Sequence, residues 1–347
     1  MQTLVTHDDS CIVIRTDKVT ISLDPTRYIR SDLAFVSHAH IDHLSKNYFK
    51  SPSTAKKVLT SKETLEFALA RGFFIGKIHE GDSTIQLLDT GHILGSKGLL
   101  VNNDLYYTGD ISIRERAFMR AEQIPKVKTL IVESTFGKPQ YIFPAVNDII
   151  HKTNKIISQM YDRGIPVLLM GYPLGKAQLL VHIFEHWEPF YAHDSVATMN
   201  SIYRKHGVRI KEMVVFSEAD KKGLLAKTKP WVMACPVMHA RSSFVTQMRE
   251  KYGAVSIGFS GWAIDKRYRA AMGFDYCLPL SDHCDYLELL KVVKLSGAQK
   301  IYTFHGFSAD FASTLKNLGF EAEAINRPER HRANGQKPMV RRLDSYF

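Results

Sequence analysis

Short apolar runs of the length of a buried strand recur along the chain, and this recurrence is the feature that most constrains the fold. Between several runs lie longer stretches with apolar residues at helical spacing. The strand-like runs cover residues 19–23, 33–36, 99–101, 105–108, 129–132, 167–170, 231–234 and 301–304. The helix-like stretches cover residues 145–163, 176–187 and 285–296. Strands that alternate with helices predict an α/β protein.

Polar residues suited to metal or phosphate chemistry follow directly after five of these runs. They are Asp24, the segment 38–43, Asp110, Glu133 and His305. The carboxyl ends of neighbouring parallel strands meet at one edge of a sheet, where the sites of α/β proteins are built. The sequence therefore predicts one site assembled from distant segments.

The composition allows a large folded protein with a phosphate-rich partner. The chain has 347 residues, of which 45% are hydrophobic, enough to bury a sizeable core. Its net charge is +11 and its isoelectric point is about 9.3. This charge suits nucleic acid, because neutralising phosphates releases counterions. A basic balance without a specific partner remains the alternative on charge alone.

Cysteine usage and hydropathy indicate the cellular setting. The four cysteines, Cys11, Cys235, Cys277 and Cys284, form no Cys-x-x-Cys pair, so neither a disulfide framework nor a thiolate zinc site is indicated. The first residues show no signal-peptide pattern, and no apolar run approaches the ~20 residues that a membrane span needs. We therefore expect a soluble, cytoplasmic protein with no membrane partner.

The segment His38-Ala39-His40-Ile41-Asp42-His43 carries the strongest local signal for metal chemistry. Imidazoles and carboxylates bind zinc or manganese at neutral pH, and a turn after a strand can direct them toward two neighbouring ions. A lone histidine is more often a structural residue than a ligand. Four potential ligands within six residues are not explained in that way. The residues that follow, 44–49, have a helical pattern.

This segment matches the HxHxDH motif of the metallo-β-lactamase superfamily, which the chain resembles in further motifs. Asp24 stands in Leu-Asp-Pro, His92 in Gly-His-Ile-Leu-Gly-Ser and Asp110 in Thr-Gly-Asp-Ile-Ser, in the same order as in the superfamily. The resemblance implies two divalent cations, with zinc as the favoured metal and manganese as the alternative. Asp24 would fix a ligand histidine through a hydrogen bond.

The resemblance divides the metal ligands into two sets and a bridge. His38, His40 and His92 would hold one ion, Asp42 and His43 the second with His305 completing its shell, and Asp110 would bridge the two ions. Superfamily membership alone does not select a substrate, because the fold also serves β-lactams, thioesters and lactones.

Five further motifs resemble the β-CASP nucleases, a branch that includes Artemis-like DNA nucleases, ribonuclease J and the cleavage-and-polyadenylation endonuclease. They are Glu-Ser-Thr-Phe-Gly at 133–137, Gly-Tyr-Pro-Leu-Gly-Lys-Ala-Gln at 171–178, Ser-Gly-Trp at 260–262, Ser-Asp-His-Cys-Asp-Tyr at 281–286 and Phe-His-Gly at 304–306. This order is most similar to the ligase-associated exonucleases.

The resemblance implies a metallo-β-lactamase αββα sandwich with an inserted α/β β-CASP cap. The sandwich would comprise residues 1–140 and 273–325, and the cap residues 141–272. Residues 326–347 would form a basic tail.

The motifs also imply a division of roles for phosphodiester hydrolysis. Two ions about 3.5–4 Å apart that share a hydroxide supply a nucleophile and neutralise the attacked phosphate. Asp42, Glu133 and His283 are the predicted catalytic residues, and His283 would bind the phosphate or protonate the departing oxygen. The residues expected to bind phosphate or substrate are Ser134, Thr135, Gly175, Lys176 and Ser260. An ordinary helix-start lysine at 176, and structural roles for Glu133, His283 and His305, remain alternatives.

Two features bear on the choice between DNA and RNA. His305 occurs in the RNA-processing branches and also in the ligase-associated group, so it does not decide. The tail ends Met-Val-Arg-Arg-Leu-Asp-Ser-Tyr-Phe and resembles sliding-clamp-binding peptides, with Leu343, Tyr346 and Phe347 as the pocket-filling residues and Val340 in place of the usual glutamine. Packing of this tail on its own domain is the alternative.

We therefore predict a metal-dependent DNA nuclease, an exonuclease leaving 5′-phosphate and 3′-hydroxyl ends, that acts in repair. An RNA-processing or RNA-degrading nuclease is the first alternative. A clamp-associated nucleic-acid-binding protein without activity is the second, disfavoured because every ligand position is filled.

Overall fold

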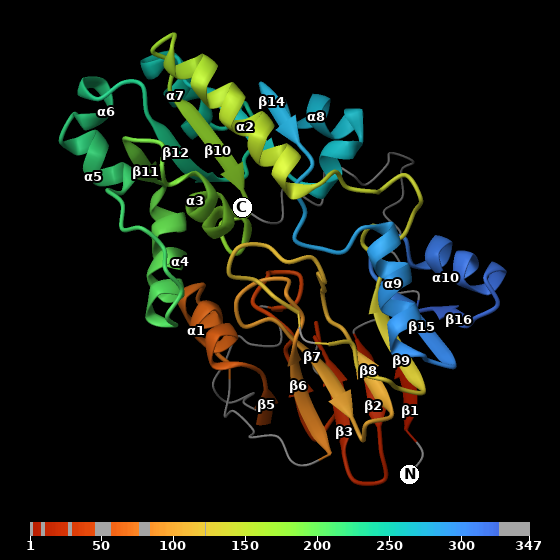
Figure 1. Cartoon of the computed structure of the whole chain (residues 1–347). Helices are drawn as coiled ribbons and strands as arrows, with labels where there is room; N and C mark the ends of the chain where they lie inside the picture. The colour runs from red at the N-terminus through yellow and green to blue at the C-terminus, as the bar shows by residue number, and fades with distance from the viewer. Residues whose placement is uncertain are drawn as a thin grey trace, which may run out of the picture. The chain divides into compact units, whose positions relative to one another are not determined.

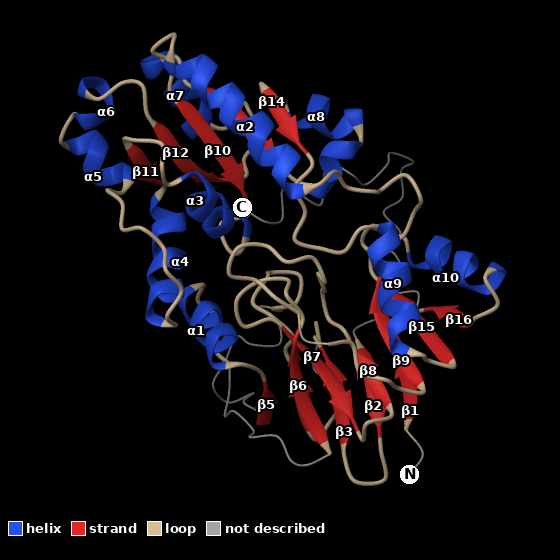
Figure 2. Cartoon of the chain, in the orientation of Figure 1, coloured by secondary structure: helices blue, strands red, loops and turns tan. Residues whose placement is uncertain are grey.

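The computed structural model describes residues 3–7, 11–26, 30–45, 57–75, 84–121 and 123–325, and its contacts divide the chain into two compact units. Among the described residues, the first unit contains those up to Glu115, Met119–Ile142 and those from His283 onward. The second unit contains Arg116–Phe118 and Phe143–Asp282. Figure 1 labels the elements along the chain, and Figure 2 separates helices from strands.

The first unit contains two sheets. One has the order β1 (Leu4–His7), β2 (Ile12–Arg15), β3 (Thr20–Leu23), β4 (Leu33–Phe35) and β5 (Lys57–Leu59). The other has the order β16 (Glu321–Ala324), β15 (Lys300–Phe304), β9 (Thr129–Glu133), β8 (Leu105–Tyr107), β7 (Lys97–Val101) and β6 (Ile85–Asp89). The helices of this unit are α1 (Lys62–Ala70), α9 (Tyr286–Ser296) and α10 (Ser308–Asn317).

The alternation of side chains along β9 explains how these layers pack. Ile131 lies in the apolar cluster that joins residues of both sheets, so the sheets pack face to face. Leu130 and Val132 point to the opposite face, because successive side chains of a strand alternate. There they join the cluster that contains Leu289 of α9 and Phe311 of α10. These two helices therefore cover the outer face of the second sheet.

The second unit is built on one parallel sheet with the order β11 (Phe190–Ala192), β12 (Val232–Pro236), β10 (Val167–Gly171), β13 (Val255–Phe259) and β14 (Tyr276–Leu278). All five residues of β10 are buried, as is usual for a central parallel strand. Its helices are α2 (Val146–Tyr161), α3 (Lys176–Phe184), α4 (Asp194–Lys205), α5 (Phe216–Lys221), α6 (Leu224–Lys227), α7 (Ser243–Tyr252), the 3₁₀ helix η2 (Gly261–Ile264) and α8 (Lys266–Met272).

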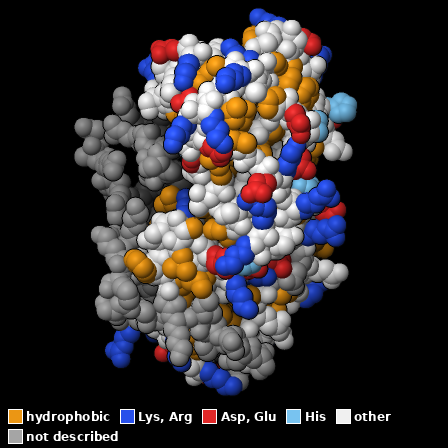
Figure 3. Space-filling view, turned by 90° about the vertical axis from the view of Figure 1, so that its left-hand side faces the viewer, with side chains coloured by type: hydrophobic (Ala, Val, Ile, Leu, Met, Phe, Trp, Pro, Cys, Tyr) orange, Lys and Arg blue, Asp and Glu red, His pale blue; other side chains and the backbone are white. Residues whose placement is uncertain are grey.

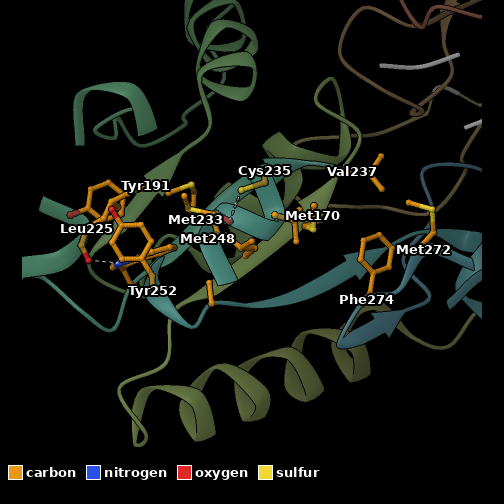
Figure 4. Packing of buried hydrophobic residues seen from close by; sticks show 14 of the residues in the cluster. Met170, Tyr191, Leu225, Met233, Cys235, Val237, Met248, Tyr252, Met272 and Phe274 are labelled. Atoms are coloured by element: carbon orange, nitrogen blue, oxygen red, sulfur yellow. Dashed lines mark hydrogen bonds between the residues drawn. The ribbon is translucent and has the colours of Figure 1, made fainter. Parts of the chain in front are cut away.

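Methionines and large aromatic residues fill the core of the second unit (Figure 4). Trp231, fully buried before β12, donates its indole N–H to the carbonyl of Leu225 over 2.9 Å. Its ring lies 5.8 Å from that of Tyr252. Met233 and Met248 occupy the same cluster, where their flexible side chains fill irregular gaps.

The predicted α/β class is confirmed, and each expected strand and helix between 19 and 304 overlaps an observed element except the one at 44–49. Leu44 and Ser45 are not helical, and positions 46–49 lie outside the described residues. The division into 1–140, 141–272 and 273–325 stays a prediction. The compact second unit extends to Asp282, because β14 pairs with β13. No helix in the described ranges is long and apolar enough to cross a membrane.

The interface between the two sheets of the first unit makes a stability prediction. Replacing Ile131 with Ala removes buried methylene groups and leaves a cavity between the sheets, so the free energy of unfolding should fall by about 2–5 kcal/mol. Leu287→Ala on α9, where the side chain is 52% exposed, is the control and should change it by less than about 0.5 kcal/mol. Urea titration measures both; equal effects would contradict the proposed core.

Candidate metal centre

Several candidate ligand residues of the first unit follow the carboxyl ends of strands in its two sheets. His38 follows β4, Asp110 follows β8 and His305 follows β15. β4 is parallel to β3, while β8 and β15 are both parallel to β9. Parallel pairing with β9 places Asp110 and His305 at the same edge of one sheet. His38 comes from the other sheet, and its Nε2 atom lies 3.5 Å from Asp110.

The carboxylate of Asp110 lies at the centre of this cluster. Its Oδ2 atom is 3.5 Å from His38 Nε2 and 3.6 Å from His92 Nε2. Its Oδ1 atom is 3.5 Å from His43 Nε2 and 3.8 Å from His305 Nδ1. The two oxygens therefore face two different sets of histidines, as a bridging carboxylate would.

Three sets of potential ligands share Asp110, and within each set the ligand atoms lie within 4.8 Å of one another. The sets are His38, His40, His92 and Asp110; His43, Asp110 and His305; and Asp110, Glu133 and His283. The first two sets correspond to the two ion sites that the sequence resemblance implies, except that Asp42 is outside them.

The donors of this cluster fit divalent cations. His38 Nε2, His43 Nε2 and Asp110 Oδ1 are buried, and within the described residues none makes a hydrogen bond of ordinary geometry. Two ligand atoms at ~2.0–2.2 Å from one tetrahedral ion lie roughly 3.3–3.6 Å apart. The 3.5 Å separations around Asp110 match this spacing and are long for direct hydrogen bonds. A cation would satisfy atoms that are otherwise costly to bury.

The electrostatics of the cluster shift the pKa values of its residues in different directions. Burial, and next the nearby His43, hold the pKa of His38 well below its usual value, so the neutral imidazole that binds metal is favoured. Burial opposes ionisation of Asp110, but His43 and His283 outweigh it and hold the pKa of Asp110 well below its usual value. Burial also opposes protonation of His43, but Asp110 and Asp24 outweigh it and raise the pKa of His43 well above its usual value, so a cation that binds there would displace a proton.

Asp24 orients the histidines from behind. It follows β3 with a backbone φ of 41°. Its Oδ2 atom lies 2.8 Å from His43 Nδ1 and accepts hydrogen bonds from the hydroxyls of Ser37 and Tyr107, each over 2.8 Å. The Ser37 backbone N–H donates to Oδ1 over 2.8 Å. Because His43 Nδ1 is held by this carboxylate, its Nε2 atom faces Asp110.

Glu133 orients His283 in a similar way. The carboxylate is fully buried, and its Oε1 atom lies 2.9 Å from His283 Nδ1 and accepts the Ile111 N–H over 2.8 Å. The Thr135 N–H donates to Oε2 over 3.3 Å. His283 Nε2 is thereby directed toward Asp110 Oδ2, 3.9 Å away. In this structure Glu133 acts on His283 and on the backbone beside Asp110.

Ser134 and Gly306 shape the turn that carries His305. His305 has a φ of 59°, in the left-handed region. The Ser134 hydroxyl lies 2.8 Å from the carbonyl of Phe304 and 2.7 Å from that of His305. A Cβ atom at Gly306 would lie 2.4 Å from Thr135 Cα, so only glycine fits this close approach. Ser134, expected beside the substrate, is fully buried and holds this turn.

Asp42 lies at the margin of the centre. Its side chain is 43% exposed, and its Oδ2 atom is 3.9 Å from His43 Nε2. His40, by contrast, belongs to the first set, with its Nδ1 atom 3.1 Å from His92 Nε2. Metal coordination and catalysis by Asp42 stay predictions.

Three residues expected to bind phosphate, Gly175, Lys176 and Ser260, belong to the second unit. Lys176 is almost fully buried, and its ammonium group donates to Asp282 Oδ1 over 2.8 Å. Gly175 precedes α3 with a φ of 94°. Ser260 Oγ accepts the Trp262 N–H over 3.2 Å. Phosphate binding by these residues stays a prediction, as does clamp binding by the tail, which lies outside the described residues.

Sequence reasoning missed three residues that support these sites. Ser37 and Tyr107 hold Asp24, and Arg116 binds Asp282. Ser37 directly precedes the HxHxDH segment, and Tyr107 directly precedes the Thr-Gly-Asp-Ile-Ser motif, so their positions give a local signal. Arg116 stands in no motif, and its contact depends on tertiary structure.

Comparison with known proteins finds relatives along most of the chain. A protein named probable DNA ligase from Opitutus terrae is 32% identical over 303 residues, covering 84% of this chain and 28% of the relative. An RNase J-like protein from Methanocaldococcus jannaschii is 26% identical over 258 residues, covering 59% of this chain and 61% of the relative. The chain thus spans less than two thirds of the length of these relatives.

A solved structure supports the fold as well. A protein of unknown function from Enterococcus faecalis V583 superposes with a TM-score of 0.63 at 15% identity, covering 94% of this chain and 98% of that one. No family model matches the chain. On its motifs and these relatives, the chain belongs to the β-CASP branch of the metallo-β-lactamase superfamily. The predicted fold, a metallo-β-lactamase sandwich with a β-CASP insertion, is confirmed.

The contacts of Asp24 make a prediction about metal affinity. Asp24→Asn removes the charge that fixes His43, so the affinity for zinc should fall by about 10–100-fold. Chelator competition measures this affinity. Asp104→Asn, which alters a surface pair with Lys128, should leave it unchanged; an unchanged affinity in Asp24→Asn would contradict the orienting role.

Proposed function

We propose that this protein is a metal-dependent nuclease that hydrolyses phosphodiester bonds of DNA, as an exonuclease in repair. One observation carries the proposal: the two carboxylate oxygens of Asp110 each face a different set of histidines. A phosphodiester is hydrolysed slowly at neutral pH, because it is negatively charged and water is a weak nucleophile. Paired cations neutralise the charge and activate the water. The family relationship supports the same chemistry.

The residues of the first unit would hold the ions in two sets. His38 and His92 face Asp110 Oδ2 and share a set with His40, while His43 and His305 face Oδ1. Bound there, two divalent cations would supply an activated water and neutralise charge on the phosphate. We propose zinc, because histidine nitrogen predominates among the donors, with manganese as the alternative.

His283 is the proposed proton donor to the leaving group. Its ring is 21% exposed, so it can reach a bound phosphate, and Glu133 holds the opposite nitrogen. In the proposed reaction the water gives one proton to solvent as its oxygen bonds to phosphorus, the bond from phosphorus to O3′ breaks, and His283 gives its Nε2 proton to O3′. His283 then regains a proton from solvent. The products are a 5′-phosphate and a 3′-hydroxyl. Glu133 stabilises the protonated imidazole before transfer.

The charge of the chain supports a nucleic-acid substrate. The net charge is +11. On the face in Figure 3, lysine and arginine side chains are spread among acidic and hydrophobic ones rather than gathered in one patch. The relative named as a probable DNA ligase favours DNA. The RNase J-like relative favours RNA, which is therefore the second candidate substrate.

A nuclease assay tests this function. End-labelled single-stranded DNA and RNA of one sequence, each with a 5′-phosphate or a 5′-hydroxyl, are incubated with zinc or manganese. We expect degradation of DNA that a chelator abolishes and added metal restores, and the label position gives the polarity. Preference for RNA would select the second candidate, and activity on neither would contradict the nuclease assignment.

Replacing His283 with Gln should separate catalysis from metal binding. The variant lacks the proton donor, so kcat should fall by about 10²–10⁴-fold. The metal content, measured by elemental analysis, should stay that of the wild type. His151→Gln on α2 is the control and should leave kcat unchanged. Wild-type kcat in His283→Gln would show that another group supplies the proton.

The tail adds a proposal about the partner. Leu343, Tyr346 and Phe347 at i, i+3 and i+4 would bind the pocket of a sliding clamp and bring the enzyme to replication or repair sites. Removing the last nine residues should abolish clamp binding in calorimetry and leave nuclease activity on naked DNA intact. Equal clamp affinity with and without these residues would contradict the proposal.

A further inference from the structure

A buried ionic cluster in the second unit lies directly before His283 in the sequence. Asp282 Oδ1 accepts hydrogen bonds from Arg116 Nη1 over 2.6 Å and from Lys176 Nζ over 2.8 Å. The side chains of all three residues are at most 5% exposed. Buried ion pairs often add little stability relative to apolar packing, so a positional role is the better explanation for this one.

Arg116 also holds the backbone at this point. Its Nη1 atom donates to the carbonyl of Ser281 over 3.2 Å, and its Nη2 atom to that of Asp282 over 3.3 Å. The guanidinium thus contacts one side-chain oxygen and two successive carbonyls. Such a forked contact restrains the backbone up to Asp282, the residue that precedes His283.

The segment after His283 is anchored as well. The Cys284 N–H donates to the carbonyl of Ile111 over 2.8 Å. Asp285 caps α9, with the Glu288 N–H donating to its Oδ1 over 2.9 Å, and Arg114 Nη2 donates to its Oδ2 over 3.1 Å. His283 therefore lies between two anchored segments.

Lys176 reaches Asp282 from the first turn of α3. Its stem packs closely beside Gly171 at the end of β10, where an added Cβ would lie 2.4 Å from Lys176 Cγ. A larger residue at position 171 would therefore collide with the Lys176 side chain as it extends to Asp282. This packing favours a fixed ion pair over a mobile cation that would bind a substrate phosphate.

We propose that Lys176 and Arg116 are positioning residues for His283, acting through the carboxylate and backbone of Asp282. Lys176 adds a second cation to the Asp282 carboxylate and restrains its side chain, and Arg116 restrains the backbone. The inference rests on the nuclease function proposed above and changes the expected role of Lys176 from binding phosphate to placing the proton donor.

The test compares Lys176→Met with the wild type in steady-state kinetics. Methionine keeps most of the stem, and the pair of Arg116 with Asp282 remains. We expect kcat to fall by between about tenfold and a hundredfold, with KM and metal content unchanged, because misplacing a reacting group affects the chemical step. A raised KM with unchanged kcat would overturn the inference in favour of phosphate binding.

A double-mutant cycle distinguishes positioning from a general loss of structure. If Lys176 acts through His283, the variant carrying both Lys176→Met and His283→Gln should be no slower than His283→Gln alone. Additive losses in kcat would contradict the inference. Lys251→Met, which breaks an exposed pair with Asp220 in the same unit, is the control and should keep wild-type kcat, while thermal unfolding reports whether each variant is folded.

Wild-type activity separates the two proposals. Metal-dependent cleavage by the wild type supports the nuclease function whatever the Lys176 variants do. Should Lys176→Met be unfolded, Arg116→Lys provides the second route, because it keeps the charge and loses the fork. It should lower kcat with KM unchanged, and a wild-type kcat would count against the inference.

Discussion

The arrangement of the first unit depends on one buried carboxylate. Ring nitrogens of five histidines, His38, His43, His92, His283 and His305, lie within 3.9 Å of the oxygens of Asp110. So many imidazoles around one acid are not a stable hydrogen-bonded core, since several of their buried atoms make no ordinary hydrogen bond within the described ranges. Cations bound beside Asp110 would resolve this conflict, and the surrounding structure keeps the candidate ligands in place.

Neighbouring residues hold the histidines of the candidate metal centre in place through hydrogen bonds. Asp24 holds His43, Glu133 holds His283, and Ser134 holds the turn of His305. Each of these contacts joins segments far apart in sequence. The same logic extends to Asp282, whose ion pairs with Arg116 and Lys176 stand next to His283 along the chain. Fixed partners of this kind are needed where a reacting group must be placed accurately.

The sequence predicted which residues gather at the candidate metal centre better than it predicted the contacts of each residue. The HxHxDH segment, His92 and Asp110 have recognisable spacing, so their meeting at one edge could be expected. The buried hydrogen bonds of Ser134 and the ion pair of Lys176 with Asp282 could not, because such partners depend on which segments pack together. Several strands were also missed. The edge strands β1 and β16 are short and partly exposed and carry only a weak apolar pattern, but the buried strands β2 and β13 were missed as well. Arg116 has no local signal at all.

Anomalous X-ray diffraction from crystals grown with zinc tests the central role of Asp110 most directly. Data collected on both sides of the zinc absorption edge locate the metal without assumptions about activity. The account predicts two peaks on either side of the Asp110 carboxylate, one beside His38, His40 and His92 and the other beside His43 and His305. A single peak away from Asp110, or no peak, would contradict it.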